Sequence, residues 1–443
     1  MKNKIILSLI FGVLYACGVN AQSLNRVKPD SLFAIISDNN KGMMSVAISK
    51  NDSVLYQKAI GFASINDQGK VPATIHTRYR VGSISKTFTA VMIFQLIEKG
   101  KLSLNDPLAK YFSTIPNADK ITVSNLLNHR SGIYNFTNDP AYLQYMTQPK
   151  SQTEMVEIIA KNKSDFEPGT KFEYSNSNYV LLGYIIEKIT GKTYSENLDQ
   201  RIVKKLNLKE TYIGTKTDLK KSESYSYRLN GVWIQQPETD LSTVAGAGAV
   251  TSTPTELNIF ITALFKNKLV SPTSLTLMKT LTEGYGMGLF QVPFGQKKGY
   301  GHNGIIDGFV SNVFYFPEDD LAVSICSNGV SYPLNDVLIA MLNSYYQVPF
   351  TLPSFKTIAL KPEELDIYPG IYSSTMLPIK ITVTKTTNGL IAQATGQGPF
   401  PLSASEKDIF KYDGAGIIMA FDPSKNEFIL KQGGRNFLFT KEK

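Results

Sequence analysis

The sequence predicts an α+β domain, in which helices flank an antiparallel sheet, followed by a small all-β barrel. Alternating apolar and polar residues occur near the N-terminus and again from about residue 285, whereas the segment between them has the i, i+3, i+4 apolar spacing of helices. Strands from both ends of one domain would then form a single sheet packed against helices. After residue 365 only short alternating segments remain, which is typical of a small barrel.

Length and composition agree with two folded domains. A chain of 443 residues is too long for one ordinary domain and suits a large domain with a smaller one. Hydrophobic residues make up 42% and charged residues 19%, which excludes a disordered chain. The 46 basic residues outnumber the 37 acidic ones, but they lie in short clusters such as Lys204-Lys205. We therefore expect a solvated surface and no nucleic-acid partner.

Residues 1–21 have a short basic start, an apolar stretch over residues 5–16 and small residues before Gln22. This pattern predicts a secretory signal peptide cleaved after Ala21, and hence a periplasmic or secreted protein. As an alternative, residues 14–17 resemble a bacterial lipobox, which would make Cys17 the lipidated first residue of an anchored lipoprotein. We find no transmembrane span in the mature chain.

Cysteine and histidine are scarce. After removal of the signal peptide only Cys326 remains, so no intrachain disulfide can form. The three histidines, His76, His129 and His302, lie far apart in the sequence and no cysteine pairs accompany them, so we expect no metal site. We expect no organic cofactor either.

The expected elements follow in order along the chain. Residues 31–61 are β-rich and predict a hairpin that turns near Asn51-Asp52. Helices are expected within residues 83–100, 121–132, 152–162, 177–194 and 245–271. Strands are expected within residues 285–294, 299–319 and 321–329.

These elements divide the chain into a main domain over residues 25–347, a proline-punctuated linker over 348–364 and a barrel domain over 365–443. Within the barrel domain, Ile379, Ile381 and Val383 alternate with polar residues up to Asn388-Gly389, a dipeptide typical of hairpin turns.

The stretch that begins at Ser83 has two interpretations. A serine before an apolar periodic run is typical of a helix start, where its hydroxyl accepts backbone N–H groups. Lys86, however, lies one turn further on, near the helix N-terminus, where a cation opposes the helix dipole. Stability alone therefore does not favour this lysine, and a nucleophile with its own base is the second interpretation.

Two further motifs decide between them. Tyr174-x-Asn176 precedes an apolar helix, and His302-x-Gly304 lies in an expected strand. Together with Ser83-x-x-Lys86, in this order, they resemble the serine β-lactamase and penicillin-binding protein superfamily, in its branch of class C β-lactamases, DD-peptidases and esterases. The phrases LLNHRSGI, PGTKFEYSN, STPTELNIF and YGMGLF resemble the same branch, so that the resemblance covers about residues 30–345. It implies a β-lactamase/transpeptidase-like fold and a serine hydrolase.

The resemblance implies catalytic roles for Ser83, Lys86 and Tyr174. Ser83 would be the nucleophile, and Lys86, with a pKa lowered by burial, the base that takes its proton. Tyr174 would share the proton transfer, either as a phenolate near Lys86 or as the acid that protonates the leaving group.

The remaining motif residues would bind substrate. Asn176 would donate to a substrate carbonyl and hold the lysine. The backbone N–H groups of Ser83 and Ile305 would form the oxyanion hole, and Gly304 would let the substrate backbone approach closely. Most β-lactamases carry lysine where this chain has His302, so two roles stay open for it: a cation that meets a substrate carboxylate, or a neutral ring that orients Tyr174 or Ser83.

We therefore expect an exported serine hydrolase that acts on a small molecule or short peptide: a D-amino-acid peptide, a β-lactam or a small ester. A penicillin-binding sensor or scaffold that acylates without turnover is the alternative. We interpret His129 as structural. The C-terminal segment resembles the lipocalin-like domain of related hydrolases, which in some of them restricts the cleft. The oligomeric state stays open.

Overall fold

The computed structural model describes residues 24–67, 69–387, 389–433 and 435–442. The predicted signal peptide over residues 1–21 and the alternative lipid site at Cys17 lie outside the described residues.

A six-stranded antiparallel sheet forms the centre of the main domain, in the order β10-β11-β12-β13-β1-β2. Its strands come from both ends of the domain, as predicted: β1 Gly42–Lys50, β2 Ser53–Ile60, β10 Phe290–Phe294, β11 Lys297–Ile306, β12 Phe309–Phe316 and β13 Leu321–Val330. Asn51 and Asp52, which join β1 to β2, both have positive φ. Asparagine and aspartate tolerate this conformation, and it matches the twist of a hairpin, so the predicted turn is confirmed.

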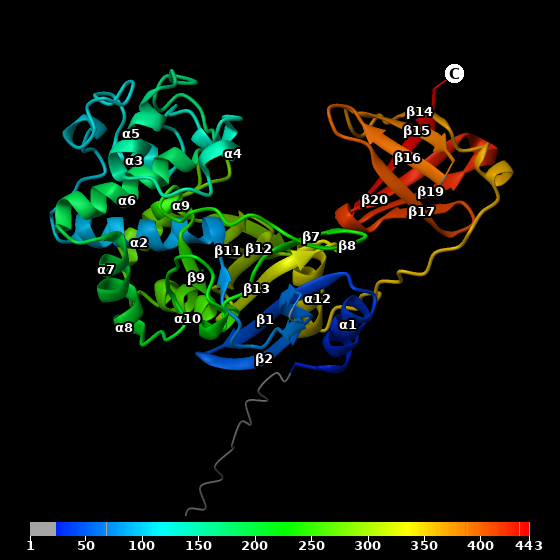
Figure 1. Cartoon of the computed structure of the whole chain (residues 1–443), viewed down its shortest axis with the longest axis horizontal. Helices are drawn as coiled ribbons and strands as arrows, with labels where there is room; N and C mark the ends of the chain where they lie inside the picture. Colours follow the sequence, from blue (N-terminus) through cyan, green and yellow to red (C-terminus); the bar gives the residue numbers. More distant parts are fainter. Residues whose placement is uncertain (1–23, 68, 388, 434, 443) are drawn as a thin grey trace, which may run out of the picture.

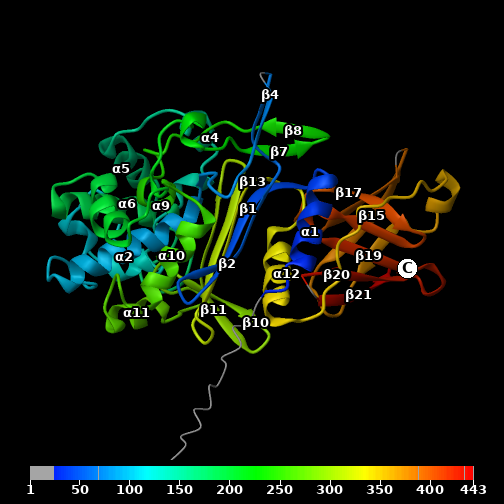
Figure 2. The ribbon, with the colours of Figure 1, turned by 90° about the horizontal axis from the view of Figure 1, so that it is seen from below.

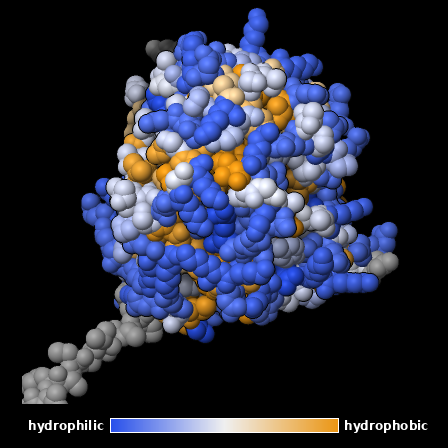
Figure 3. Space-filling model, turned by 90° about the vertical axis from the view of Figure 1, so that its left-hand side faces the viewer, coloured by the Kyte–Doolittle hydropathy of each residue, from blue (hydrophilic) through white to orange (hydrophobic). Residues whose placement is uncertain are grey.

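Most helices cover one face of this sheet (Figure 2). The longest are α2, α6 and α10, and they share a continuous apolar core with the sheet. The helices on this side are α2 Ser85–Glu98, α3 Val123–Leu127, α4 Tyr142–Tyr145, α5 Gln152–Ala160, α6 Asn176–Thr190, α7 Tyr194–Leu198, α8 Lys204–Leu206, α9 Ala245–Gly248, α10 Pro254–Phe265 and α11 Pro272–Lys279. Seen from this side the surface is mostly hydrophilic, with apolar side chains gathered in its upper half (Figure 3).

Two helices cover the opposite face, α1 Val27–Asp38 and α12 Leu334–Tyr346 (Figure 2). The prediction that β structure begins at about residue 31 is wrong, because this segment belongs to α1. Its apolar residues Leu32, Phe33 and Ile36 are buried on one helix face against the sheet.

Small sheets, bridges and single turns connect these layers. The strands are β3 Phe62–Asn66, β4 Gly69–Pro72, β5 Tyr79–Arg80, β6 Tyr212–Ile213, β7 Tyr227–Asn230, β8 Val232–Gln235 and β9 Val250–Ser252. The 3-10 and π turns are η1 Gly82–Ile84, η2 Leu108–Lys110, η3 Phe136–Asn138, η4 Asp199–Val203 and η5 Leu219–Lys221. Strand β5 leads directly into η1, which carries Ser83.

The C-terminal part closes into an antiparallel barrel in the order β14 to β21, as predicted, with β14 pairing with β21. Its strands are β14 Gly370–Ser373, β15 Lys380–Thr386, β16 Gly389–Ala394, β17 Phe400–Glu406, β18 Ile409–Tyr412, β19 Ile417–Asp422, β20 Glu427–Gln432 and β21 Arg435–Lys441. The turns η6 Pro362–Leu365, η7 Asp413–Ala415 and η8 Pro423–Lys425 accompany them. The barrel has its own apolar core, separate from the cores of the main domain.

The barrel contacts the main domain near α12 (Figure 1). Lys41 forms an ion pair with Asp413 at 2.6 Å, and Gly416 lies against Pro333 and Asp336. These contacts are on the α1 and α12 side of the sheet, whereas Ser83 lies on the α2 side. The contacts therefore do not support the expectation that the barrel restricts the cleft.

None of the helices in the described part of the chain is long and apolar enough to span a membrane.

Candidate active site

Ser83 lies in the 3-10 turn η1, immediately before α2. Neither helix start uses the Ser83 side chain as a cap, so its hydroxyl does not have the structural role of a helix cap. Gly82 has a φ of +52°, and a Cβ on it would lie 2.9 Å from the backbone of Ile305. The turn therefore needs glycine at this position to bring Ser83 next to strand β11.

The Lys86 amine is the centre of the site. Its Nζ lies 3.0 Å from Ser83 Oγ, 2.8 Å from Asn176 Oδ1 and 2.9 Å from the carbonyl oxygen of Ala247. The side chain is completely buried, and burial places the pKa of Lys86 well below its usual value. The structure thus gathers Ser83, Lys86 and Asn176 around one nitrogen.

The partners of Lys86 define which way a proton can move. The oxygens of Asn176 and Ala247 can only accept hydrogen bonds, whereas the Ser83 hydroxyl can also donate. A neutral amine uses its two N–H groups for the two oxygens and directs its lone pair toward Ser83. This arrangement suits a base that takes the proton of the serine hydroxyl.

Tyr174 borders the same amine, since Lys86 Nζ lies 4.9 Å from the centre of its ring. Its hydroxyl oxygen is buried and forms no hydrogen bond of ordinary geometry with the described residues. Burial raises the pKa of Tyr174, although the nearby Ser83 side chain acts in the opposite direction. The hydroxyl is therefore protonated at neutral pH, which favours the acid over the phenolate.

Asn176 is the first residue of α6, and Ser175 rather than Asn176 is the N-cap. Its backbone N–H donates to Asn135 Oδ1 at 3.0 Å, and its Nδ2 donates to Thr137 Oγ1 at 3.0 Å. These bonds orient the amide so that its oxygen faces Lys86.

Gly304 and Ile305 lie on β11 beside η1, the turn that carries Ser83. A Cβ on Gly304 would lie 1.9 Å from the carbonyl oxygen of Val81 and 3.0 Å from Ser83 N. The protein's own backbone therefore already requires glycine at position 304, and the expected approach of a substrate backbone stays a prediction. Ile305 has its backbone against Gly82 and a side chain that is 66% exposed.

His302 is not an exposed cation. It is only 1% exposed, its Nδ1 donates to the carbonyl oxygen of Asn303, and its Nε2 accepts from the Tyr285 hydroxyl at 2.9 Å. Burial, together with the Lys86 charge, lowers the pKa of His302 to about 3. Both ring nitrogens are occupied, so the arrangement favours the neutral role over the cationic one, and the ring's hydrogen-bond partner is Tyr285 and not Tyr174 or Ser83.

Three residues near the site were not predicted as functional. The Ala247 carbonyl is a backbone group in α9, so no side chain in the sequence could indicate it. Tyr285 belongs to the phrase YGMGLF, which could have indicated it. The His129 ring, which the sequence led us to interpret as structural, lies 4.3 Å from the Tyr174 ring, centre to centre.

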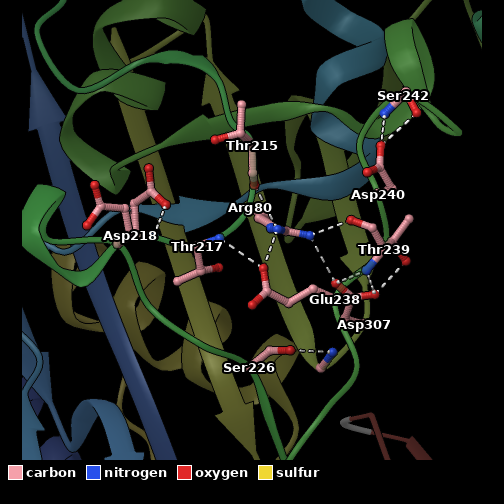
Figure 4. Close-up of polar contacts among 12 residues, drawn as sticks. Arg80, Thr215, Thr217, Asp218, Ser226, Glu238, Thr239, Asp240, Ser242 and Asp307 are labelled. Atoms are coloured by element: carbon pink, nitrogen blue, oxygen red, sulfur yellow. Dashed lines mark hydrogen bonds and ion pairs between the residues drawn. The ribbon is translucent and has the colours of Figure 1, made fainter. Parts of the chain in front are cut away.

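Arg80, on β5, links the segment just before η1 to the end of β11 (Figure 4). Its guanidinium donates to the carbonyl oxygen of Thr239 at 2.7 Å and forms ion pairs with Glu238 at 2.8 Å and Asp307 at 3.5 Å. Asp307 follows β11 directly. A cavity of about 880 Å³ lies beside this cluster, but Ser83 and Lys86 do not line it.

Within the described ranges, no group of three or more His, Cys, Asp and Glu side chains lies close enough together to hold a metal ion.

The comparisons with known proteins agree with this geometry. The model of the family described as Beta-lactamase matches residues 16–342, well over half of the chain. The chain therefore belongs to the beta-lactamase family of hydrolases. Among curated proteins, the teichoic acid D-alanine hydrolase of Staphylococcus aureus is 31% identical over 230 residues, which are 52% of this chain and 55% of that protein. The chain spans about half the length of the curated relatives it matches.

Solved structures with the same fold include two hydrolases. The D-amino acid amidase from Ochrobactrum anthropi SV3, in complex with L-phenylalanine, has a TM-score of 0.62 and 27% identity, covering 72% of this chain and 98% of that one. The D-stereospecific amidohydrolase from Streptomyces sp. has a TM-score of 0.60 and 27% identity, covering 71% and 97%. The octameric penicillin-binding protein homologue from Pyrococcus abyssi, at 24% identity, shares the fold over 93% of this chain with a TM-score of 0.66.

Proposed function

We propose that this chain is an exported serine hydrolase that cleaves amide or ester bonds through an acyl-Ser83 intermediate. The observation that carries the proposal is the set of partners of Lys86, in which Ser83 is the only one that can donate a hydrogen bond. The fold and the family membership support the same reaction class.

In the acylation step, Ser83 Oγ attacks the carbonyl carbon of the substrate while its proton passes to Lys86 Nζ. The carbonyl oxygen becomes an oxyanion, which the backbone N–H groups of Ser83 and Ile305 stabilise. Asn176 keeps its oxygen on Lys86, donates one amide N–H to Thr137 and offers the other to the rest of the substrate.

The tetrahedral intermediate then breaks its bond to the leaving nitrogen or oxygen. Tyr174, protonated because burial raises its pKa, donates its proton to that atom and regains one from Lys86. The amine of Lys86 is neutral again, and acyl-Ser83 remains. In deacylation, water attacks the acyl carbon as its proton passes to Lys86 or Tyr174. The bond between the acyl carbon and Ser83 Oγ then breaks, Ser83 Oγ takes that proton back, and the carboxylic acid product leaves.

The neutral state of His302 bears on the substrate class. A buried, neutral imidazole with both nitrogens occupied offers no charge to a substrate carboxylate. This argues for substrates without a carboxylate next to the scissile bond and against penicillins. The relatives named above act, by their names, on D-amino-acid amides and D-alanine groups. We propose D-aminoacyl amides and esters as the substrate class.

A substrate panel tests this proposal. The chain without residues 1–21 is assayed on D- and L-alanine p-nitroanilide, D-alanine methyl ester, p-nitrophenyl acetate and nitrocefin, with Ser83→Ala as the control. We expect kcat/KM for the D-aminoacyl substrates to exceed that for their L forms and for nitrocefin at least about tenfold, and Ser83→Ala to be inactive. Preference for nitrocefin would identify a β-lactamase instead. A single burst without turnover would support the sensor or scaffold.

Export, and the division of the chain into a main domain over residues 25–347 and a barrel domain over 365–443, are part of the same proposal. The mass of the mature N-terminus, determined after expression with the full leader, distinguishes cleavage after Ala21 from lipidation at Cys17. An unprocessed N-terminus would contradict export.

A further inference from the structure

His129 is completely buried inside the site but takes no part in the proposed reaction. It follows α3 and has a φ of +57°, an uncommon conformation for a residue with a side chain. Its ring packs against the Tyr174 ring at 4.3 Å and the Tyr285 ring at 4.8 Å, centre to centre. A strained residue held against a proton donor calls for a functional explanation.

His129 forms hydrogen bonds with the residues on both sides of Tyr174 in the sequence. The backbone N–H of Glu173, the residue before the tyrosine, donates to the His129 carbonyl oxygen at 3.0 Å. The backbone N–H of Ser175, the residue after it, donates to His129 Nδ1 at 3.2 Å. One residue thus binds the backbone N–H groups of both neighbours of Tyr174, that of Glu173 through its main chain and that of Ser175 through its side chain.

The same ring nitrogen also reaches helix α6. Asn178 Nδ2 lies 3.2 Å from His129 Nδ1, and the Asn178 oxygen accepts from Ser131 Oγ at 2.6 Å. His129 Nδ1 therefore accepts from two N–H donors, which requires its lone pair and places the ring proton on Nε2. Burial also places the pKa of His129 well below its usual value, so the acceptor persists at neutral pH.

We propose that His129 is a positioning residue, which fixes the Tyr174 hydroxyl beside Ser83 and Lys86 by binding the backbone N–H groups of the residues on either side of the tyrosine. The proposal rests on the proposed function, because it assigns Tyr174 the transfer of a proton. It requires a hydrogen-bond acceptor at the Nδ1 position and a residue that accepts positive φ.

Two matched variants separate the acceptor from the backbone conformation. Glycine and asparagine both tolerate positive φ, but only asparagine carries a side-chain oxygen near the place of Nδ1. We expect kcat per active site, titrated with a fluorophosphonate, to fall about 100-fold in His129→Gly with little change in KM. We expect kcat per active site of His129→Asn to stay within about fivefold of the wild-type value. If His129 had only a structural role, both variants would have a lower active fraction but an unchanged kcat per active site.

A double-mutant cycle tests whether the effect passes through Tyr174. If His129 acts by positioning the tyrosine, His129→Gly should cost little further activity in a Tyr174→Phe background. A full, additive loss in that background, or equal kcat per site in His129→Gly and wild type, would overturn the proposal.

A crystal structure of His129→Gly judges the proposal independently of activity. We expect the Tyr174 hydroxyl to move away from Ser83, and an unchanged position would contradict the proposal. If the wild-type protein neither labels at Ser83 nor hydrolyses any substrate, the proposed function fails, and the position of Tyr174 in this variant still decides whether His129 holds it.

Discussion

Lys86 Nζ and Ser83 Oγ lie 3.0 Å apart, and the other hydrogen-bond partners of Lys86 Nζ are the acceptor-only oxygens of Asn176 and Ala247. The lysine thus faces the serine as a base only when it is neutral. Burial favours the neutral form, because a buried ammonium loses its hydration. The predictions below depend on this relationship and on the groups around it.

Replacement of Lys86 should remove activity at every pH. In the wild type, kcat/KM for a neutral ester should rise with pH through the lowered pKa of Lys86, because the neutral fraction of the amine increases. Lys86→Arg stays charged, so we expect a loss of about 1,000-fold or more that higher pH does not restore, and a similar loss in Lys86→Ala. Lys99→Arg, just beyond the end of the same helix, is the control. A loss below about tenfold in Lys86→Arg would place the base elsewhere.

His302 should make the protein less stable in acid. Its pKa is about 3 in the folded chain and about 6.5 when unfolded, so between these values only the unfolded chain binds the proton. The free energy of unfolding should therefore fall as pH decreases through this range, by up to about 1.4 kcal/mol per pH unit, and be fully retained above it. Urea unfolding of the wild type and His302→Gln at several pH values measures this contribution of His302 to the free energy of unfolding. The same pH dependence of that free energy in both proteins would refute the prediction.

The variant His302→Lys tests the role of His302 in substrate recognition. The variant buries an ammonium group and loses the acceptor for Tyr285, so we expect activity to fall on acidic and neutral substrates alike. A selective gain on penicillins, measured against p-nitrophenyl acetate, would restore the cationic role.

Gly304→Ala should damage catalysis more than folding. The Cβ of the alanine would lie 1.9 Å from Val81 O and 3.0 Å from Ser83 N, so strand β11 must move away from η1. Such overpacking costs about 1–3 kcal/mol of stability, and it also separates the two N–H groups of the oxyanion hole. Gly398→Ala, where a Cβ meets nothing within 4 Å, is the matched control. Equal kcat/KM for both variants would argue against a hole formed by Ser83 and Ile305.

The barrel should be dispensable for small substrates. Its ion pair between Lys41 and Asp413 lies on the sheet face opposite to α2, and its apolar core is its own. We propose the boundaries 25–347, 348–364 and 365–443, and expect a chain truncated after Pro353 to fold and to retain kcat/KM on p-nitrophenyl acetate within a few fold. A changed substrate range would instead support restriction of the cleft by the barrel.

The main parts of the fold and the proximity of Ser83 to Lys86 could be predicted from the sequence because their signals are local. Ser83 and Lys86 are three residues apart, and the strands show their alternation directly. The neutral form of the His302 ring could not be predicted, because it depends on burial of the ring and on its hydrogen bond with Tyr285, which lies in a different segment. Ala247 contributes a backbone carbonyl, which no residue type reveals. Helix α1 was missed because a short apolar run fits both a strand and a buried helix face.

The most direct test of the central claim is to trap the acyl enzyme. The wild type and Ser83→Ala are reacted with a fluorophosphonate and, separately, with a slowly hydrolysed activated ester, and the modified peptide is identified by mass spectrometry. We predict one adduct, on Ser83, and none in Ser83→Ala, which should remain folded because the Ser83 side chain caps neither helix start. An adduct on another residue, or undiminished turnover in Ser83→Ala, would contradict the account.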